Sequence, residues 1–104
     1  MGYRVVVTED AEADFDRYVR YLLFEKKNEQ AAKNLLDDFE LTMDKLEEAA
    51  GSLKLCDNLE LRKLGYRRIN FLYHHYFMLY RVEGEKVIID MIFHDQQDYE
   101  NRIN

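Results

Sequence analysis

A pair of strands and the tight turn between them are encoded in YFMLYRVEGEKVIIDMIFH, residues 76–94. Residues 86–94 are almost continuously apolar, which is typical of a central strand covered on both faces. Gly84 lies between the strands, where a positive φ would close the hairpin. Residues 76–82 alternate as a strand does, so one side would carry Tyr76, Met78, Tyr80 and Val82, and the other Phe77, Leu79 and Arg81. This stretch predicts the centre of an antiparallel sheet.

Four further segments show a regular period. Residues 3–7 are a β-branched, aromatic run that favours a strand, and residues 66–70 favour another. Two amphipathic periods lie between them, over residues 9–26 and 29–50. The short break between these two segments predicts an antiparallel helical hairpin.

The ends of these elements carry their own signals. Thr8 is expected to cap the first helix, and Gly51 to end the second in a left-handed conformation. Residues 51–63 have little period and indicate a loop, and residues 95–104 indicate a short polar tail. The expected fold class is therefore α+β, with a helical hairpin packed on one face of a mainly antiparallel four-stranded sheet. We expect one domain over residues 1–104.

Length and composition agree with such a domain. The chain has 104 residues, of which 47% are hydrophobic and 35% charged, and a chain of this size can bury about two-thirds of its unfolded surface. The single cysteine, Cys56, excludes an internal disulfide. No apolar run approaches the ~20 residues that a membrane span needs, and none resembles a signal peptide. These features predict a soluble cytoplasmic protein.

Charge is distributed unevenly along the chain. The net charge is −6, but residues 9–48 carry −7, residues 54–81 carry +4 and residues 82–104 carry −4. An acidic total disfavours general binding to nucleic acid, because phosphate contacts dominate that affinity. The basic middle is either a solvated face or a patch for an anionic partner.

Few side chains suggest chemistry. The adjacent histidines His74 and His75 would point to opposite faces of a strand and could not share an ion, and His94 with Asp95 lacks a third ligand at a suitable spacing, so no metal site is expected. No glycine-rich phosphate loop or other cofactor motif is present. His94 closes the last expected strand beside Asp95 and could move protons near neutral pH. The alternative is that the same histidine bonds a neighbouring carboxylate and only holds the tail to the sheet.

The order of these segments resembles one family. The chain is similar over essentially its whole length to toxins of the RelE/ParE type, which belong to type II toxin–antitoxin (plasmid stabilisation or addiction) modules. The segments that carry the resemblance are Thr8–Phe15, Ala31–Ala32, Leu64–Ile69, Tyr76–Val82, Val87–His94 and Gln97–Asp98. The resemblance implies a growth-inhibiting toxin that a cognate antitoxin neutralises, and it is compatible with a toxin–antitoxin hetero-oligomer.

One branch of the family, the RelE/YoeB-like toxins, cleaves messenger RNA in the ribosome without a metal. The resemblance places the usual central-strand arginine at Phe77, so that arginine is missing here. Loss of a guanidinium from a phosphate site removes a strong charge-assisted contact. If the chain is a nuclease, its catalytic residues would be His94 with Arg67 and Arg68.

The other branch, the ParE-like toxins, has no nuclease site and poisons DNA gyrase through protein contacts. The missing arginine favours this gyrase-directed, non-nuclease function. A nuclease with an altered site and a degenerate, non-toxic binding module are the alternatives, so whether the chain is an enzyme stays open.

An antitoxin would meet the basic stretch. Charge complementarity predicts that an acidic antitoxin segment covers a set of arginines, either as an added strand or as a helix in a groove. These arginines are Arg62, Arg67, Arg68 and Arg81. A C-terminal functional segment is expected at Asp95, Gln97, Asp98 and Tyr99.

Overall fold

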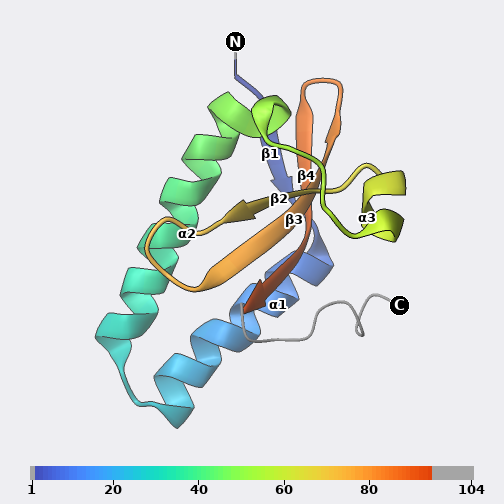
Figure 1. The fold of residues 1–104 in the computed structure, drawn as a ribbon. Helices are drawn as coiled ribbons and strands as arrows, with labels where there is room; N and C mark the ends of the chain where they lie inside the picture. Colours follow the sequence, from blue (N-terminus) through green and yellow to red (C-terminus); the bar gives the residue numbers. More distant parts are fainter. Residues whose placement is uncertain (1, 95–104) are drawn as a thin grey trace.

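A computed structural model describes residues 2–94 of the chain. Figure 1 shows a helical hairpin beside a sheet, with a short third helix beyond the sheet. A π-helical turn, Tyr21–Glu25, continues the first helix, and a 3-10 turn, Ala50–Ser52, follows the second. The elements run β1 (Arg4–Val7), α1 (Glu9–Arg20), α2 (Glu29–Ala49), α3 (Leu59–Lys63), β2 (Arg67–Asn70), β3 (Tyr76–Glu83) and β4 (Lys86–His94).

The sheet has four strands in the order β1-β4-β3-β2. The pairs β2–β3 and β3–β4 are antiparallel, and only β1 pairs in parallel, with β4. The predicted α+β class with a mainly antiparallel sheet is confirmed. The turn between β3 and β4 contains Gly84 at φ 62°, which is the positive φ predicted for it.

The ladder between β3 and β4 contains one bulge. Tyr80 pairs with Ile89 while Leu79 pairs with Met91, so Asp90 is the additional residue on β4. An additional residue changes which side of the sheet the following residues face. Asp90 and Met91 therefore both lie on the face away from the helical hairpin.

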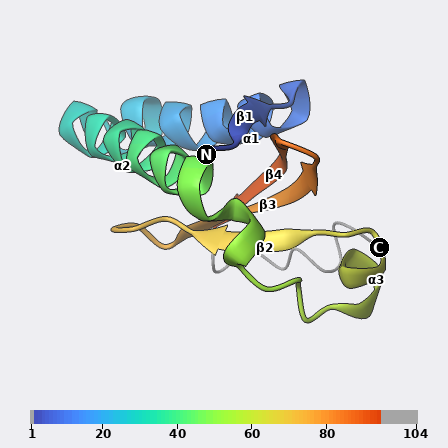
Figure 2. The same ribbon diagram turned by 90° about the horizontal axis from the view of Figure 1, so that it is seen from above.

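One face of the sheet packs on the helical hairpin. Viewed from above, α1 and α2 form a layer on one side of the strands, and α3 lies on the other side (Figure 2). The rings of Phe15 and Phe39 stack between the helices with centroids 4.3 Å apart. The buried residues of this layer are Ala11, Phe15, Leu35, Leu46, Ala50, Ile69, Phe71, Met78, Tyr80, Val87, Ile89 and Ile92.

The opposite face has a smaller core. Residues from α3 and the loop before it bury the outer sides of β3 and β4. This confirms the prediction that β4 is covered on both faces, and β3 is covered in the same way. The alternation predicted for residues 76–82 is also confirmed, because Met78 and Tyr80 lie in the larger core and Phe77 and Leu79 in the smaller. The smaller core consists of Cys56, Leu61, Phe77, Leu79 and Phe93.

Two sequence predictions about the region after α2 were wrong. Residues 51–63 were expected to be a loop, but they contain α3, which Asn58 caps by accepting the backbone N–H of Leu61 at 3.1 Å. Five residues are too few to show a helical period. Gly51 does not adopt a left-handed conformation. It lies in the 3-10 turn, where a Cβ would collide with the Tyr3 hydroxyl.

Both long helices begin at a side-chain cap, and the cap predicted at Thr8 is confirmed. Thr8 accepts the N–H of Ala11 at 3.2 Å, and Asn28 accepts the N–H of Ala31 at 2.9 Å. The first helix was expected to run to residue 26, but its α-helical part ends at Arg20 and continues as the wider π-helical turn. Within residues 2–94, no helix combines the length and apolarity needed to cross a membrane.

Candidate functional site

Strand β2 forms one edge of the sheet. Phe71 donates its N–H to the carbonyl of Tyr76, so the alternating ladder directs the backbone groups of Asn70 away from β3. A single bridge between Leu55 and Arg67 covers the beginning of this edge. The later part of β2 therefore presents backbone donors and acceptors at the rim of the sheet.

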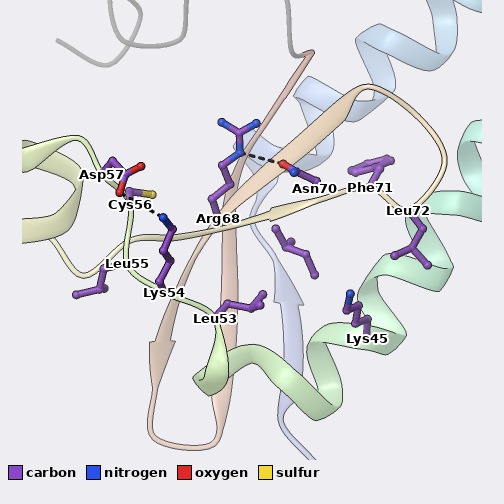
Figure 3. Close-up of a pocket in the computed structure, with 11 residues that line it drawn as sticks. Lys45, Leu53, Lys54, Leu55, Cys56, Asp57, Arg68, Asn70, Phe71 and Leu72 are labelled. Atoms are coloured by element: carbon purple, nitrogen blue, oxygen red, sulfur yellow. Dashed lines mark hydrogen bonds and ion pairs between the residues drawn. The ribbon is translucent and has the colours of Figure 1, made fainter.

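A groove of about 560 Å³ runs along this edge, and we call it the β2-edge groove. Figure 3 shows that three elements line it: the loop before α3, strand β2 with the residues after it, and α2 through Lys45. Its charged side chains are Lys45, Lys54, Asp57 and Arg68, and its apolar ones include Leu53, Leu55, Ile69, Phe71 and Leu72. Three cations against one carboxylate, over an apolar floor, suit an acidic segment that also carries apolar side chains.

Arg68 is held in a defined position at this groove. Its Nε donates to the Asn70 side-chain carbonyl at 2.9 Å (Figure 3), and its guanidinium carbon lies 3.8 Å from the centre of the Phe77 ring. A guanidinium on an aromatic face is stabilised by the ring quadrupole. The charge of Arg68 therefore lies on the sheet face away from the helical hairpin.

Asp38 determines the shape of the far end of the groove. This residue lies on α2 with only 1% of its surface exposed. Its carboxylate accepts the N–H groups of Leu72 at 3.0 Å and Tyr73 at 2.9 Å, and lies 2.7 Å from Nδ1 of His74. Burial alone would raise the pKa of Asp38, but these hydrogen bonds outweigh it and lower the pKa below the usual value. The ionised carboxylate thus holds Leu72 in the groove wall.

The four predicted arginines do not form one cluster. Arg62 donates to the carbonyl of Cys56 at 3.1 Å, on the side of α3, and its charge, like that of Arg68, lies close enough to act on the Cys56 thiol. Arg67 pairs across the sheet with Tyr80 and donates to the carbonyl of Leu53, so it lies on the side of the helical hairpin. Adjacent residues of one strand face opposite sides, which separates Arg67 from Arg68.

Arg81 belongs to a separate polar cluster. Its Nε donates to the Asp90 carboxylate at 2.8 Å, and the Tyr66 hydroxyl donates to the same oxygen at 2.8 Å. The bond to Asp90 raises the pKa of Arg81, while burial, with the bond to Asp90 adding to it, raises the pKa of Tyr66. The bulge in β4 places Asp90 here, so this cluster holds the segment after α3 against the sheet.

His94 ends β4, as predicted, on the side of the helical hairpin. Its ring contacts the Tyr76 ring edge-on at 4.9 Å, and its backbone N–H donates to the Tyr18 hydroxyl at 3.2 Å. On β3, His94 pairs with Tyr76 and Arg67 pairs with Tyr80. These two positions are four residues apart, which corresponds to about 13 Å along a strand. The structure therefore does not bring together the three candidate nuclease residues. The predicted C-terminal segment Asp95, Gln97, Asp98 and Tyr99 lies outside the described residues.

The groove also contains residues that the sequence did not single out, namely Lys45, Asn70 and Leu72. Lys45 lies in the most acidic part of the chain, where one lysine gives no signal. Asp38 did carry a signal, because it occupies a core position of the α2 period, between Leu35 and Thr42, where an acidic residue is unusual. Within the part of the chain that is described, no three acidic, histidine or cysteine side chains are grouped as a metal site.

Comparison with known proteins supports the fold and shows the family. The fold matches a solved structure described as "Chromosomal ParDE TA system from P. aeruginosa", with a TM-score of 0.69 and 19% identity over 88% of this chain and 95% of that chain. At this identity the likeness establishes the fold. The family model for the ParE toxin of the type II toxin–antitoxin system, parDE, matches residues 5–99, so the chain belongs to the ParE toxin family. A search of curated proteins found no match.

Proposed function

We propose that this chain is a toxin that arrests growth through protein contacts, with DNA gyrase as its target, and that a cognate antitoxin neutralises it. Membership of the ParE toxin family supports the toxin function. The choice of a non-nuclease mechanism rests on one observation, the separation of the candidate catalytic residues described above.

Cleavage of RNA without a metal needs several side chains around one phosphate. A general acid or base must lie within about 2.6–3.2 Å of the proton that it transfers. Arg68 lies on one face of the sheet, whereas Arg67 and His94 lie on the other and pair with different ends of β3. The position expected for the phosphate-binding arginine is occupied by Phe77, a side chain that is 1% exposed. This geometry favours binding over phosphodiester cleavage.

We further propose that the antitoxin inserts an acidic segment into the β2-edge groove. The backbone of Asn70 can extend the sheet by one strand, and Lys45, Lys54 and Arg68 supply the complementary charge. Arg62, on the same side, would lie at the margin of this contact. Arg67 and Arg81, which already bond to neighbouring groups, would contribute through the positive field around the groove.

Induction of the chain alone, with separate pulse labelling of DNA, RNA and protein synthesis, tests the function. An early stop in DNA synthesis with DNA breaks, relieved by co-expression of the antitoxin, is the expected result. An early stop in protein synthesis with cut messages would contradict the gyrase target and support the nuclease. Absence of arrest would contradict toxicity and leave a degenerate binding module.

The variant His94→Ala separates the two mechanisms. Growth arrest should persist, because arrest through protein contacts needs no proton transfer by His94, whose contacts with Tyr76 and Tyr18 lie on the side of the helical hairpin. A nuclease centred on His94 should lose its activity. His94→Gln serves as the control, since it keeps a polar side chain of similar size, and thermal unfolding of both variants reports any loss of the Tyr76 contact.

A further inference from the structure

Beside strand β1, the helical hairpin carries a second hollow, of about 220 Å³, which we call the hairpin groove. It is lined by α1, by α2 and by Val7 of β1, which is the edge of the sheet opposite to β2. Its apolar wall includes Val7, Val19, Leu36 and Phe39, and its acidic side chains are Glu12 and Asp16.

The floor of the hairpin groove is rigid and partly open to solvent. Phe39 stacks on Phe15 with the ring centroids 4.3 Å apart, which fixes the spacing of the two helices. Leu36, at the mouth, is 42% exposed. A large apolar side chain exposed beside a preformed hollow offers surface that a partner can bury.

The charge around this groove is negative. Glu12 and Asp16 follow each other by one turn of α1, and Glu40 lies one turn after Leu36 on α2. Arg20 bonds to Asp16 at 2.7 Å and partly offsets it. Residues 9–48 nevertheless carry a net charge of −7. An acidic rim around an apolar floor is complementary to a surface that is apolar along one stripe and basic beside it.

We propose that the hairpin groove docks a basic amphipathic helix of a partner protein. A furrow between two packed helices accepts the ridge of a third helix, whose apolar residues recur at i, i+3, i+4 and i+7. The β2-edge groove is basic and suits an acidic segment, so the two surfaces select partners of opposite charge. This inference does not depend on the identity of the toxin's target or on the antitoxin site.

The probe for this test is a fluorescein-labelled peptide of about 18 residues, long enough for roughly five helical turns, with leucine at i, i+3, i+4 and i+7 and lysine beside them. Fluorescence anisotropy with the full chain near physiological salt reports its binding. A scrambled peptide of the same composition has the same charge but no apolar stripe. We expect the amphipathic peptide to bind about tenfold or more tightly than the scrambled one.

Two variants locate the peptide. Leu36→Glu and the pair Glu12→Lys with Asp16→Lys should each weaken binding about tenfold. The control pair Asp44→Lys with Glu48→Lys makes the same change in net charge as Glu12→Lys with Asp16→Lys, at exposed positions about 80° and 120° around α2 from Leu36, and should change the affinity by less than about twofold. Equal losses in the control, or equal binding of the scrambled peptide, would overturn the proposal. Self-association of the chain that Leu36→Glu abolishes would also overturn it, because a second copy would then occupy the groove.

Discussion

Nδ1 of His74 lies 2.7 Å from a carboxylate oxygen of Asp38, a contact that joins the loop between β2 and β3 to the middle of α2. The same carboxylate accepts the backbone N–H groups of Leu72 and Tyr73. One buried side chain therefore fixes three successive loop residues. Because Leu72 lines the β2-edge groove, Asp38 connects the packing of α2 with the shape of the candidate site.

Replacement of Asp38 should destabilise the fold. In Asp38→Asn the side chain loses its charge, and its amide N–H₂ group must face backbone N–H donors of Leu72 or Tyr73. The expected loss is about 2–3 kcal/mol in the free energy of unfolding, measured by urea denaturation. Asp37→Asn, at the exposed neighbouring position, is the control and should change that free energy by less than about 0.5 kcal/mol. Equal losses in the two variants would contradict the prediction that the buried carboxylate of Asp38 stabilises the fold more than an exposed one does.

The same carboxylate should make the protein sensitive to acid. Burial opposes ionisation of Asp38, yet the bonds from His74, Tyr73 and Leu72 lower its pKa in the folded state below the unfolded value of about 3.9. A group with a lowered pKa stabilises the fold above the unfolded pKa, and this stabilisation is lost as the pH falls through the folded pKa. Between about pH 5 and pH 2, the melting temperature of the wild type should therefore fall more steeply than that of Asp38→Asn. Parallel curves would contradict this assignment.

Tyr80 should make the stability of the fold depend on pH in the alkaline range. Its buried hydroxyl donates to the carbonyl of Ala50 at 2.7 Å, and burial raises its pKa to about 12. Because this pKa is raised on folding, the protonated Tyr80 hydroxyl contributes its full stabilisation below the unfolded pKa of about 10. The contribution is lost as the pH rises through the pKa of Tyr80 in the folded state. Tyr80→Phe should cost about 1–2 kcal/mol at neutral pH and make unfolding above pH 10 less steep. Denaturant titrations at neutral and alkaline pH measure both effects.

The prediction for Gly51 concerns space and not backbone conformation. A Cβ at this position would collide with the hydroxyl of Tyr3, which packs against the larger core. Gly51→Ala should destabilise the fold by about 1–3 kcal/mol. Tyr3→Phe removes the colliding oxygen, so the double variant should recover part of that loss, as a double-mutant cycle in chemical denaturation would measure. Additive losses would indicate that the two residues do not interact.

The elements of the fold could be predicted wherever the chain is long enough to show a period. The alternation through Met78 and Tyr80 assigned β3 to its two faces correctly, and Thr8 marked the start of α1. Predictions from local sequence were wrong where a segment is too short to show a period, as in α3. They were also wrong where the requirement for a residue comes from a side chain that is distant in the sequence. A glycine after a long helical period is typical of a helix end, but the need for glycine at position 51 comes from the close approach of Tyr3, a residue 48 positions earlier.

The candidate site was less predictable than the fold, because it depends on contacts across the chain. Of the four arginines predicted to meet an antitoxin, only Arg68 lines the β2-edge groove, where it is joined by Lys54 from the same basic stretch. No local pattern could pair Asp38 with His74, 36 residues away. The alternation of a strand did imply that Arg67 and Arg68 face opposite sides, and this separation weakens the nuclease alternative.

The β2-edge groove predicts which arginine an antitoxin contacts most closely. Arg68→Glu reverses a charge that lies beside the groove, so it should weaken binding of the cognate antitoxin about tenfold or more, mainly through a slower association rate. The dependence of that rate on salt between about 50 and 300 mM should also become shallower. Arg20→Glu, on the helical hairpin, makes the same change in net charge and serves as the matched control.

Surface plasmon resonance with immobilised antitoxin measures both association rates. Since Arg68 also lies over the ring of Phe77, thermal unfolding of Arg68→Glu must first show that the variant is folded. A folded variant that binds the antitoxin as the wild type does would place the antitoxin elsewhere. An equal loss in Arg20→Glu would mean that net charge, and not the β2-edge groove, governs the encounter.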